Sequence, residues 1–210
     1  MKVNTAKART ATARRTQAER TAATRARLLK AARKLFADRG FADVSTQAIV
    51  EKAGVTRGAL YHQYADKVEL FAAVYEQMEQ ELVDQVAAQI AELGPADPLE
   101  AMRVGARLFL DACAAPDVQR VVLIDAPAVL GWERWRAVGV RYGLGVIEAM
   151  LANAVAQGAI PEQPLRPTAH VLLGALDEAA LYVSRADDQE QARRDMDAVC
   201  ERLIRGIAAR

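Results

Sequence analysis

Apolar residues recur at helical spacing along most of this 210-residue chain. The clearest stripe lies near the C-terminus, at i, i+3, i+4, i+7, i+8 and i+11: Met196, Val199, Cys200, Leu203, Ile204 and Ile207. Such spacing places apolar side chains on one face of an α-helix. No segment shows a convincing alternation of apolar and polar positions, which is the mark of a half-buried β-strand. The pattern therefore predicts an all-α fold.

Capping residues, glycines and prolines divide this pattern into separate helices. Asp66 and Glu69 form a capping box that starts a long helix, and Gly94 ends it. Pro127 and Gly131 bracket a predicted turn, and the proline-rich residues 158–167 are predicted to form a loop. We expect helices over residues 24–39, 46–52, 55–62, 67–91, 98–114, 117–126, 132–156, 168–184 and 188–208.

Residues 45–62 have the pattern of two short helices joined by a glycine turn. Ser45 can cap the first helix because its hydroxyl accepts an amide hydrogen bond of the first turn. Gly54 suits the turn because glycine takes a positive φ without steric cost. In the second helix Leu60 points inward, whereas Arg57 and its polar neighbours point outward. This arrangement matches the helix-turn-helix, whose second helix enters the major groove of DNA.

The first turn of that second helix carries side chains suited to reading bases. Arg57 can donate two parallel hydrogen bonds to guanine O6 and N7, although a phosphate contact or a solvated charge is an alternative role. Gly58 lets the helix backbone approach the groove wall. Ala59 could meet a thymine methyl group, and Thr56 a phosphate or a base edge.

This region also resembles the TetR family of transcriptional regulators over roughly residues 21–70. The residues that carry the resemblance are Gly40, Phe41, Ser45, Ile49, Ala53, Gly54, Val55, Thr56, Gly58, Leu60, Tyr61, His62, Tyr64, Lys67 and Leu70. Two mild departures are Val50, where a small alanine is usual, and Gln63-Tyr64, where His-Phe is common. The resemblance implies further DNA contacts, mostly to phosphates, from Ser45, Thr46, Gln47, Tyr61, His62 and Lys67.

The charges are distributed unevenly along the chain. Residues 1–67 hold 15 Lys and Arg against 5 Asp and Glu, whereas residues 68–210 hold 13 against 22. A basic N-terminal third suits a polyanion such as DNA. We therefore expect a basic arm over residues 1–20, a DNA-binding domain over residues 21–66 and a helical body over residues 67–210. The arm could enter an A·T-rich minor groove or remain a solvated tail, and its composition superficially resembles a transit peptide.

The resemblance implies that the body binds a small molecule and forms a homodimer. Aromatic and methionine side chains, with one histidine, are the candidates for an apolar or aromatic effector: Met78, Met102, Phe109, Trp132, Trp135, Tyr142, His170 and Tyr182. Asp125 and Asp177 are further isolated polar candidates, and core packing is the alternative role for the apolar ones. The candidates for the dimer interface are Leu173, Leu176, Ala180, Leu203 and Ile207.

The expected function is a repressor that binds a palindromic operator as a dimer and is released by its effector. An enzyme is disfavoured because the two histidines, His62 and His170, belong to no metal-binding motif and no GxSxG motif occurs, so we expect no cofactor or metal.

Cys113 and Cys200 fit buried free thiols in a reducing cytoplasm. No run of 18 apolar residues predicts a membrane span. The alternative is an architectural protein that binds DNA without sequence preference.

Overall fold

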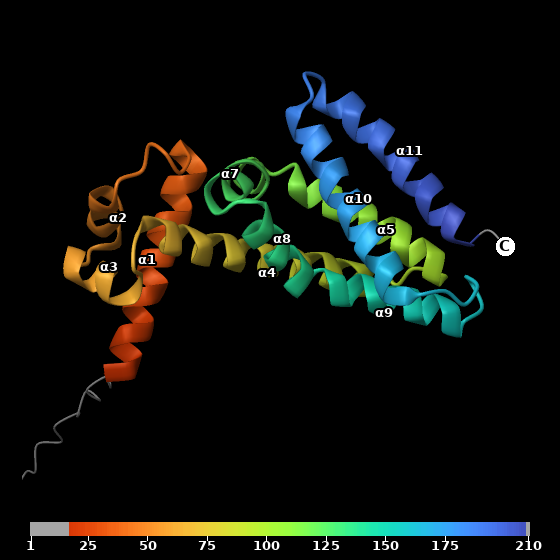
Figure 1. The fold of residues 1–210 in the computed structure, drawn as a ribbon, viewed down its shortest axis with the longest axis horizontal. Helices are drawn as coiled ribbons and strands as arrows, with labels where there is room; N and C mark the ends of the chain where they lie inside the picture. The colour runs from red at the N-terminus through yellow and green to blue at the C-terminus, as the bar shows by residue number, and fades with distance from the viewer. Residues whose placement is uncertain (1–16, 209–210) are drawn as a thin grey trace, which may run out of the picture.

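The structure is a computed structural model that describes residues 17–208, and every regular element in that range is a helix (Figure 1). This confirms the predicted all-α class. Three helices form a head at one end of the molecule: α1 (Gln17–Arg39), α2 (Thr46–Ala53) and α3 (Arg57–Gln63). The long helix α4 (Lys67–Leu93) leads from this head along the body.

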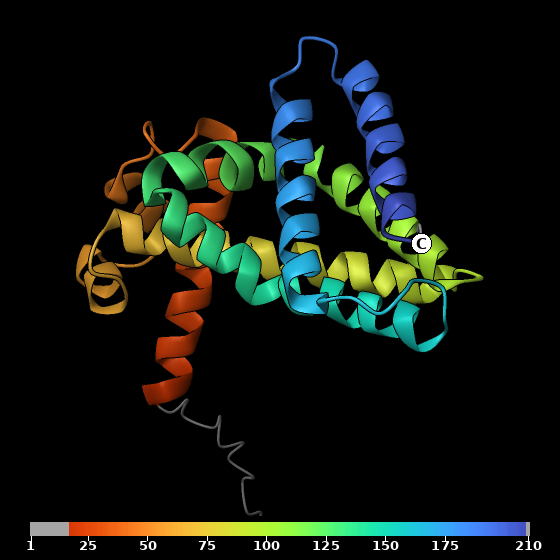
Figure 2. The same ribbon diagram turned by 45° about the vertical axis from the view of Figure 1, so that its right-hand side comes forward.

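The body packs a second set of helices against α4. Its elements are α5 (Pro98–Cys113), α6 (Pro116–Val118), the π-helical segment η1 (Gln119–Asp125), α7 (Ala126–Leu130), α8 (Trp132–Tyr142), α9 (Leu144–Ala156), α10 (Leu165–Arg185) and α11 (Gln189–Ala208). The last two form an antiparallel pair joined by a short loop (Figure 2). Within residues 17–208, no single helix is long and apolar enough to cross a membrane, and the bent pair of α8 and α9 meets that test jointly by length and composition alone.

Side-chain caps set the starts of the helices in the head. The Ser45 hydroxyl accepts a hydrogen bond from the amide of Ala48 at 3.1 Å, as the sequence predicts. The Thr56 hydroxyl accepts one from the amide of Ala59 at 3.2 Å, so α3 begins at Arg57 rather than at residue 55. Asp66 caps α4 by accepting from the Glu69 amide at 2.8 Å, which is half of the predicted capping box; the Glu69 carboxylate instead pairs with Arg134. The first helix begins earlier than predicted, at Gln17, inside the range assigned to the arm; the rest of that assignment lies outside the described residues.

An aromatic cluster fixes the head to the start of α4. The ring centroids of Phe36 and Phe41 lie 5.8 Å apart, and each lies 5.1 Å from the ring of Phe71. Phe36 on α1 and Phe71 on α4 are completely buried. Leu60, the inward residue of α3, is completely buried as well. The head and the first turns of α4 therefore share one core.

The prediction of one helix over residues 132–156 is wrong. The chain bends by 44° between α8 and α9, at Gly143. A Cβ atom at this glycine would lie 3.1 Å from the carbonyl oxygen of Gly139 and 3.3 Å from Leu173 of α10. The glycine therefore allows α10 to approach closely, and it weakens the helix at the same point.

The segment before this bend also differs from the prediction. The expected helix over residues 117–126 is the short α6 followed by η1, and the expected turn at Pro127 is the helix α7. Pro127 is tolerated because it lies in the first turn of α7, where amide hydrogens need no partner within that helix. Gly131, with φ +78°, ends α7 and allows α8 to start.

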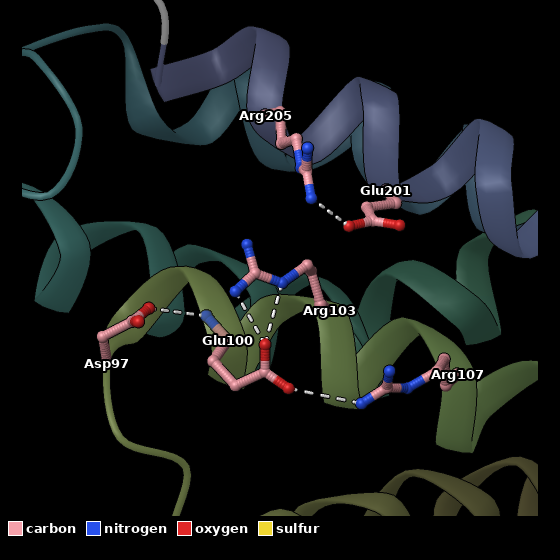
Figure 3. Close-up of polar contacts among 6 residues, drawn as sticks. All are labelled: Asp97, Glu100, Arg103, Arg107, Glu201 and Arg205. Atoms are coloured by element: carbon pink, nitrogen blue, oxygen red, sulfur yellow. Dashed lines mark hydrogen bonds and ion pairs between the residues drawn. The ribbon is translucent and has the colours of Figure 1, made fainter.

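Polar contacts attach α11 to α5 unevenly along its length. Near the start of α11, Arg193 donates to Asp111 at 2.8 Å and to the carbonyl oxygen of Arg107 at 3.0 Å, both on α5. Near the end of α11, the Glu201–Arg205 pair stays within that helix. The pairs that Glu100 makes likewise stay within α5, so no ion pair among the residues drawn in Figure 3 joins the two helices.

Candidate DNA-binding surface and ligand cavity

Helix α3 lies at one end of the molecule (Figure 1), and its outer face carries exposed polar side chains. Arg57, Tyr61 and His62 are all exposed, whereas Leu60 between them is buried. The guanidinium carbon of Arg57 lies 5.7 Å from the centre of the Tyr61 ring. Hydrogen bonds from Arg57 and, second, from Thr46 lower the pKa of the Tyr61 hydroxyl below its ordinary value. The start of α2 and the first turn of α3 thus form one exposed polar cluster.

Gly58 lies on this face and is not required by the packing of the protein. A Cβ atom there would have no neighbour closer than the Thr56 hydroxyl oxygen at 4.0 Å. Gly54 differs, because it has φ +60° and its Cβ would lie 2.7 Å from a guanidinium nitrogen of Arg27. Gly54 is therefore needed for the turn of the folded chain. Gly58 is not needed for packing, and its lack of a side chain leaves the surface of α3 open at that point.

The other residues expected at the DNA lie around α3. Gln47 is exposed on α2 and donates to Glu51 at 2.7 Å, and Ala59 is half-buried. The hydroxyls of Ser45 and Thr56 accept capping bonds, and each still has a proton to donate.

Lys67 is held by the loop between α1 and α2. It donates to the carbonyl oxygens of Phe41 at 2.9 Å and Val44 at 3.0 Å, and lies 4.0 Å from the centre of the Phe41 ring. One of its three N–H groups remains for a phosphate.

Several polar contacts join the head to the body. Asp125, the last residue of η1, accepts a hydrogen bond from the backbone amide of Phe41 at 2.8 Å in a partly buried position. Arg134 of α8 forms a bidentate pair with Glu69 at the start of α4, at 2.7 and 2.9 Å. Arg33 of α1 pairs with Glu81 of α4 and, at 3.6 Å, with Asp117 of α6. The Asp125 contact is more enclosed than these exposed ion pairs.

A cavity of about 100 Å³ lies inside the body, between α4, α5, α9, α10 and α11. Its wall is almost entirely apolar and comprises Leu82, Val83, Val86, Ile90, Met102, Gly105, Ala106, Phe109, Gly143, Val146, Ile147, Met150, Leu172, Leu173, Ala175, Leu176, Cys200, Leu203 and Ile204, together with Glu79. Among these residues, all within the described part of the chain, Glu79 is the one charged side chain. An apolar cavity of similar size can hold a single aromatic ring.

Glu79 lies on the wall between this cavity and a smaller adjoining space. It is 8% exposed, and it has no hydrogen-bonding partner among residues 17–208. Burial, and then the nearby charge of Asp177, raise the pKa of its carboxyl to about 7. Asp177 lines the smaller space and pairs with Arg136 at 2.7 Å; burial raises its pKa to about 6, against the effect of Arg136.

The smaller space also touches the segment that contacts the head. Val122 and Leu123 of η1 line it together with Trp135. The indole of Trp135 donates to the carbonyl oxygen of Val122 at 3.0 Å, and the carbonyl oxygen of Trp135 accepts from the Tyr75 hydroxyl at 2.9 Å. A continuous set of contacts therefore runs from the cavity wall through η1 to Phe41.

The candidate effector residues are distributed over several places. Met102 and Phe109 line the cavity, and Trp135 and Asp177 line the adjoining space. Met78 is buried in the core, and the Tyr142 hydroxyl donates to Glu76 at 2.9 Å outside the cavity. Trp132, His170 and Tyr182 are exposed.

Glu79 did not figure among the candidates. A charged residue at position 79, within the apolar stripe of residues 75, 78 and 82, was the signal in the sequence.

The candidate dimer residues divide between the interior and the surface. Leu173 and Leu176 line the cavity, and Ala180 is buried within the protomer. Leu203 lines the cavity and is also 46% exposed, and Ile207 is partly buried. On α10, Val171 and Tyr182 are 71% and 52% exposed and add apolar surface that the sequence reading did not select.

Both cysteines are buried free thiols, which confirms the prediction made for Cys113 and Cys200. Burial raises the pKa of each thiol, so both remain protonated near neutral pH. The part of the chain that the structure describes holds no cluster of three His, Cys, Asp or Glu side chains placed to bind a metal ion.

Raising the pH from 5 to 8 is expected to destabilise the wild-type protein relative to Glu79→Gln. The Glu79 carboxyl has a pKa of about 7 in the fold against an ordinary value of 4.5, so the folded state keeps a proton that the unfolded chain loses. The stabilisation is fully present below about pH 4.5 and is lost as the pH rises through about 7. The difference in the free energy of unfolding should change by roughly 2 kcal/mol, measured by urea denaturation at both pH values. A difference independent of pH would contradict this account of Glu79.

Two family models match the chain. Residues 28–74 match the family described as bacterial regulatory proteins, tetR family, and residues 99–207 match the tetracyclin repressor-like C-terminal domain. The first corresponds to the head and the start of α4, and the second to the helices that enclose the cavity with α4.

Solved structures show the same arrangement over nearly the whole chain. A TetR-family transcriptional regulator from Pectobacterium atrosepticum is 35% identical, with 93% of this chain and 99% of that chain covered and a TM-score of 0.81. The complex of RolR with resorcinol is 23% identical, with 92% and 97% covered and a TM-score of 0.72.

The match to a curated relative is shorter. The Transposon Tn10 TetC protein of Escherichia coli is 25% identical over 124 residues, which are 59% of this chain and 61% of that protein. This chain thus spans about three fifths of the length of that relative.

Proposed function

This chain belongs to the TetR family of bacterial regulatory proteins, and we propose that it is a ligand-responsive repressor that binds a palindromic operator as a homodimer. It is a transcriptional regulator with a DNA-binding and a ligand-binding domain, and it is not an enzyme. We further propose that a small apolar or aromatic effector releases it from DNA in the cytoplasm. One observation carries the proposal: α4 begins in the head and forms part of the cavity wall.

The DNA-binding surface that we propose is centred on the exposed face of α3. Arg57 would read guanine and Ala59 a thymine methyl, while Gly58 lets the helix lie close to the groove. Contacts to the phosphates would come from the surrounding residues, which are Ser45, Thr46, Gln47, Thr56, Tyr61, His62 and Lys67. These phosphate contacts fix the register, and the base contacts supply the specificity.

The homodimer that we propose forms through α10 and α11. Leu203 and Ile207, with the exposed Val171 and Tyr182, provide apolar surface on the outside of this pair. The interior side of the same pair of helices carries Leu173, Leu176 and Ala180, which would pack beneath that surface. A two-fold dimer presents two copies of α3, about 34–36 Å or a multiple apart if both enter major grooves on one side of the DNA. The operator would therefore be a palindrome.

The effector would act by occupying the cavity of the body. Its apolar wall and volume of about 100 Å³ suit one ring or a short aliphatic chain. RolR, which has the same fold, is known in complex with resorcinol, a small aromatic compound. An effector there would press on α4 directly and on η1 through the adjoining space, and both elements contact the head. Effector and DNA would then weaken each other's binding by the same factor.

Selection of genomic fragments by the purified protein tests the proposed function. The expected result is the enrichment of one palindromic sequence, bound by a dimer in analytical ultracentrifugation. The architectural alternative predicts tight binding without enrichment of any sequence, because backbone contacts alone carry no sequence information. A monomer at micromolar concentration would remove the proposed source of operator symmetry.

A further inference from the structure

The cavity wall contains one carboxyl group that lacks a partner. Glu79 faces both the apolar cavity and the smaller space beside it, and no hydrogen bond reaches it from the described residues. Its neighbour one turn earlier, Tyr75, directs its hydroxyl to the Trp135 carbonyl oxygen instead. The Glu79 oxygens are not among the fully enclosed unpartnered side-chain atoms of the described residues, so they reach the cavity space. A ligand there could therefore supply the hydrogen-bonding partner that the described residues do not.

The rest of the cavity wall offers no strong hydrogen-bond donor to Glu79. Apart from the Cys200 thiol, a weak donor, the described side chains around the cavity are hydrocarbon, thioether or glycine. A ligand with a polar group therefore meets a carboxyl group as its main partner. Such a wall accepts a hydrogen-bond donor and disfavours an anion, because two like charges in an apolar space repel strongly.

The surrounding charges favour a cation over a neutral donor. The groups that face Glu79 come from each packed element: Tyr75 on α4, Cys113 on α5, Arg136 on α8 and Asp177 on α10. Burial keeps Tyr75 and Cys113 protonated, and Arg136 is paired with Asp177 at 2.7 Å. Once ionised, Glu79 therefore adds one uncompensated negative charge, which a single positive charge on the ligand would neutralise.

We propose that Glu79 is the anchor for the effector, and that the effector is a small, mainly apolar molecule carrying one protonated amine. The inference rests on the proposed function, because it assumes that the cavity holds the effector. The apolar part would occupy the space between α5, α9 and α11, and the ammonium group would donate to the Glu79 carboxylate. The same wall rejects carboxylate-bearing ligands.

Four probes that share one ring and differ in the attached group test this proposal. Benzylamine, benzyl alcohol, toluene and benzoate are titrated into the wild-type protein at pH 8 by calorimetry. We expect benzylamine to bind roughly tenfold to a hundredfold more tightly than benzyl alcohol or toluene, as a charge-assisted hydrogen bond gives, and benzoate to bind most weakly. Glu79→Gln should remove the preference for benzylamine, because it removes the charge and keeps the shape.

Glu76→Gln is the matched control. Glu76 lies on the same helix but outside the cavity, where it pairs with Arg141 and accepts from Tyr142. This variant makes the same change of charge and should keep the preference for benzylamine. Helical circular dichroism checks that both variants fold.

A second measurement needs no variant. At pH 6.5 the binding of benzylamine by the wild-type protein should release protons from Glu79, because its pKa lies at about 7. Calorimetry in two buffers with different heats of ionisation detects this release, and toluene should cause none.

Four outcomes would overturn the inference. Equal binding of all four probes, or the same order of affinities in Glu79→Gln, would show that the carboxyl group does not select the ligand. A preference for benzoate would show that the cavity favours an anionic ligand over a cationic one. Failure of every probe to bind would show that the cavity does not take ligands of this size. The proposed function is judged separately by the operator selection, which uses no ligand.

Discussion

The substitution Arg57→Ala is expected to abolish selective binding to the operator while leaving the fold intact. Arg57 is exposed on α3 and is not a core residue, so its removal should not disturb the packing of the head. Each bidentate contact to guanine discriminates by about 1–3 kcal/mol, and a dimer makes two of them. Affinity for the operator should therefore fall roughly 30-fold to 20,000-fold, whereas affinity for unrelated DNA should fall much less. Competition binding with operator and scrambled duplexes measures both quantities.

Two further variants distinguish hydrogen bonding to bases from sequence-independent electrostatic attraction to DNA. Arg57→Lys keeps the positive charge but lacks the planar fork of donors, so it should retain non-specific affinity and lose discrimination. Lys52→Ala removes a positive charge from the exposed end of α2 and should weaken binding slightly and equally for all sequences. If Arg57→Lys discriminates as well as the wild-type protein, Arg57 contacts a phosphate rather than a base.

The second large effect is expected from Asp125→Ala, which should uncouple the binding of the effector from the release of DNA. Asp125 ends η1, whose Val122 and Leu123 line the space beside the cavity, and it holds the Phe41 amide of the head at 2.8 Å. In the wild-type protein a bound effector should lower operator affinity about 5-fold to 150-fold, the usual range for coupled sites. In Asp125→Ala this factor should fall toward one. The measurement is operator affinity with and without whichever benzyl probe binds the wild-type protein most tightly.

The controls use a conservative variant and a neighbouring contact. Asp125→Asn keeps an oxygen that can accept from Phe41, so much of the coupling should remain. Arg134→Ala removes the exposed pair with Glu69, which also joins head and body, and should change little because exposed ion pairs contribute about 0–1 kcal/mol. An undiminished coupling factor in Asp125→Ala would mean that the signal travels through α4 alone.

The head could be predicted from sequence because its signals are local. Ser45 caps α2 through an amide three residues away, and Gly54 takes the positive φ that its position requires. The inward position of Leu60 follows from helical periodicity within a few residues. Each of these features depends on neighbours in the chain, so no knowledge of the tertiary structure was needed.

The cavity could not be predicted in the same way because contacts between distant helices create it. The bend at Gly143 lies where Leu173 of α10 approaches the chain closely, and neither residue alone signals it in the sequence. The apolar positions of α5 and α10 indicate which helix faces are buried. They do not show whether such a face packs in a filled core or lines a cavity. Phe109 at the cavity and Met78 in the core thus had the same pattern. Glu79 was visible as a charge in an apolar stripe, and the structure was needed to show that it lacks a partner.

In the proposed mechanism, helix α4 would act as a lever arm, because its first turn holds the head and the effector would act on it near its middle, at Glu79. Twelve residues separate Lys67, which holds the loop of the head, from Glu79 in the cavity wall, and this distance along the helix is about 18 Å. A tilt of about 5° at Glu79 would move the head by roughly 1.5 Å over that length. Two protomers tilting in opposite directions would double the change in the separation of their α3 helices. In the proposed mechanism, a ligand no larger than one ring would thus change the separation of the two α3 helices while the described helices stay folded.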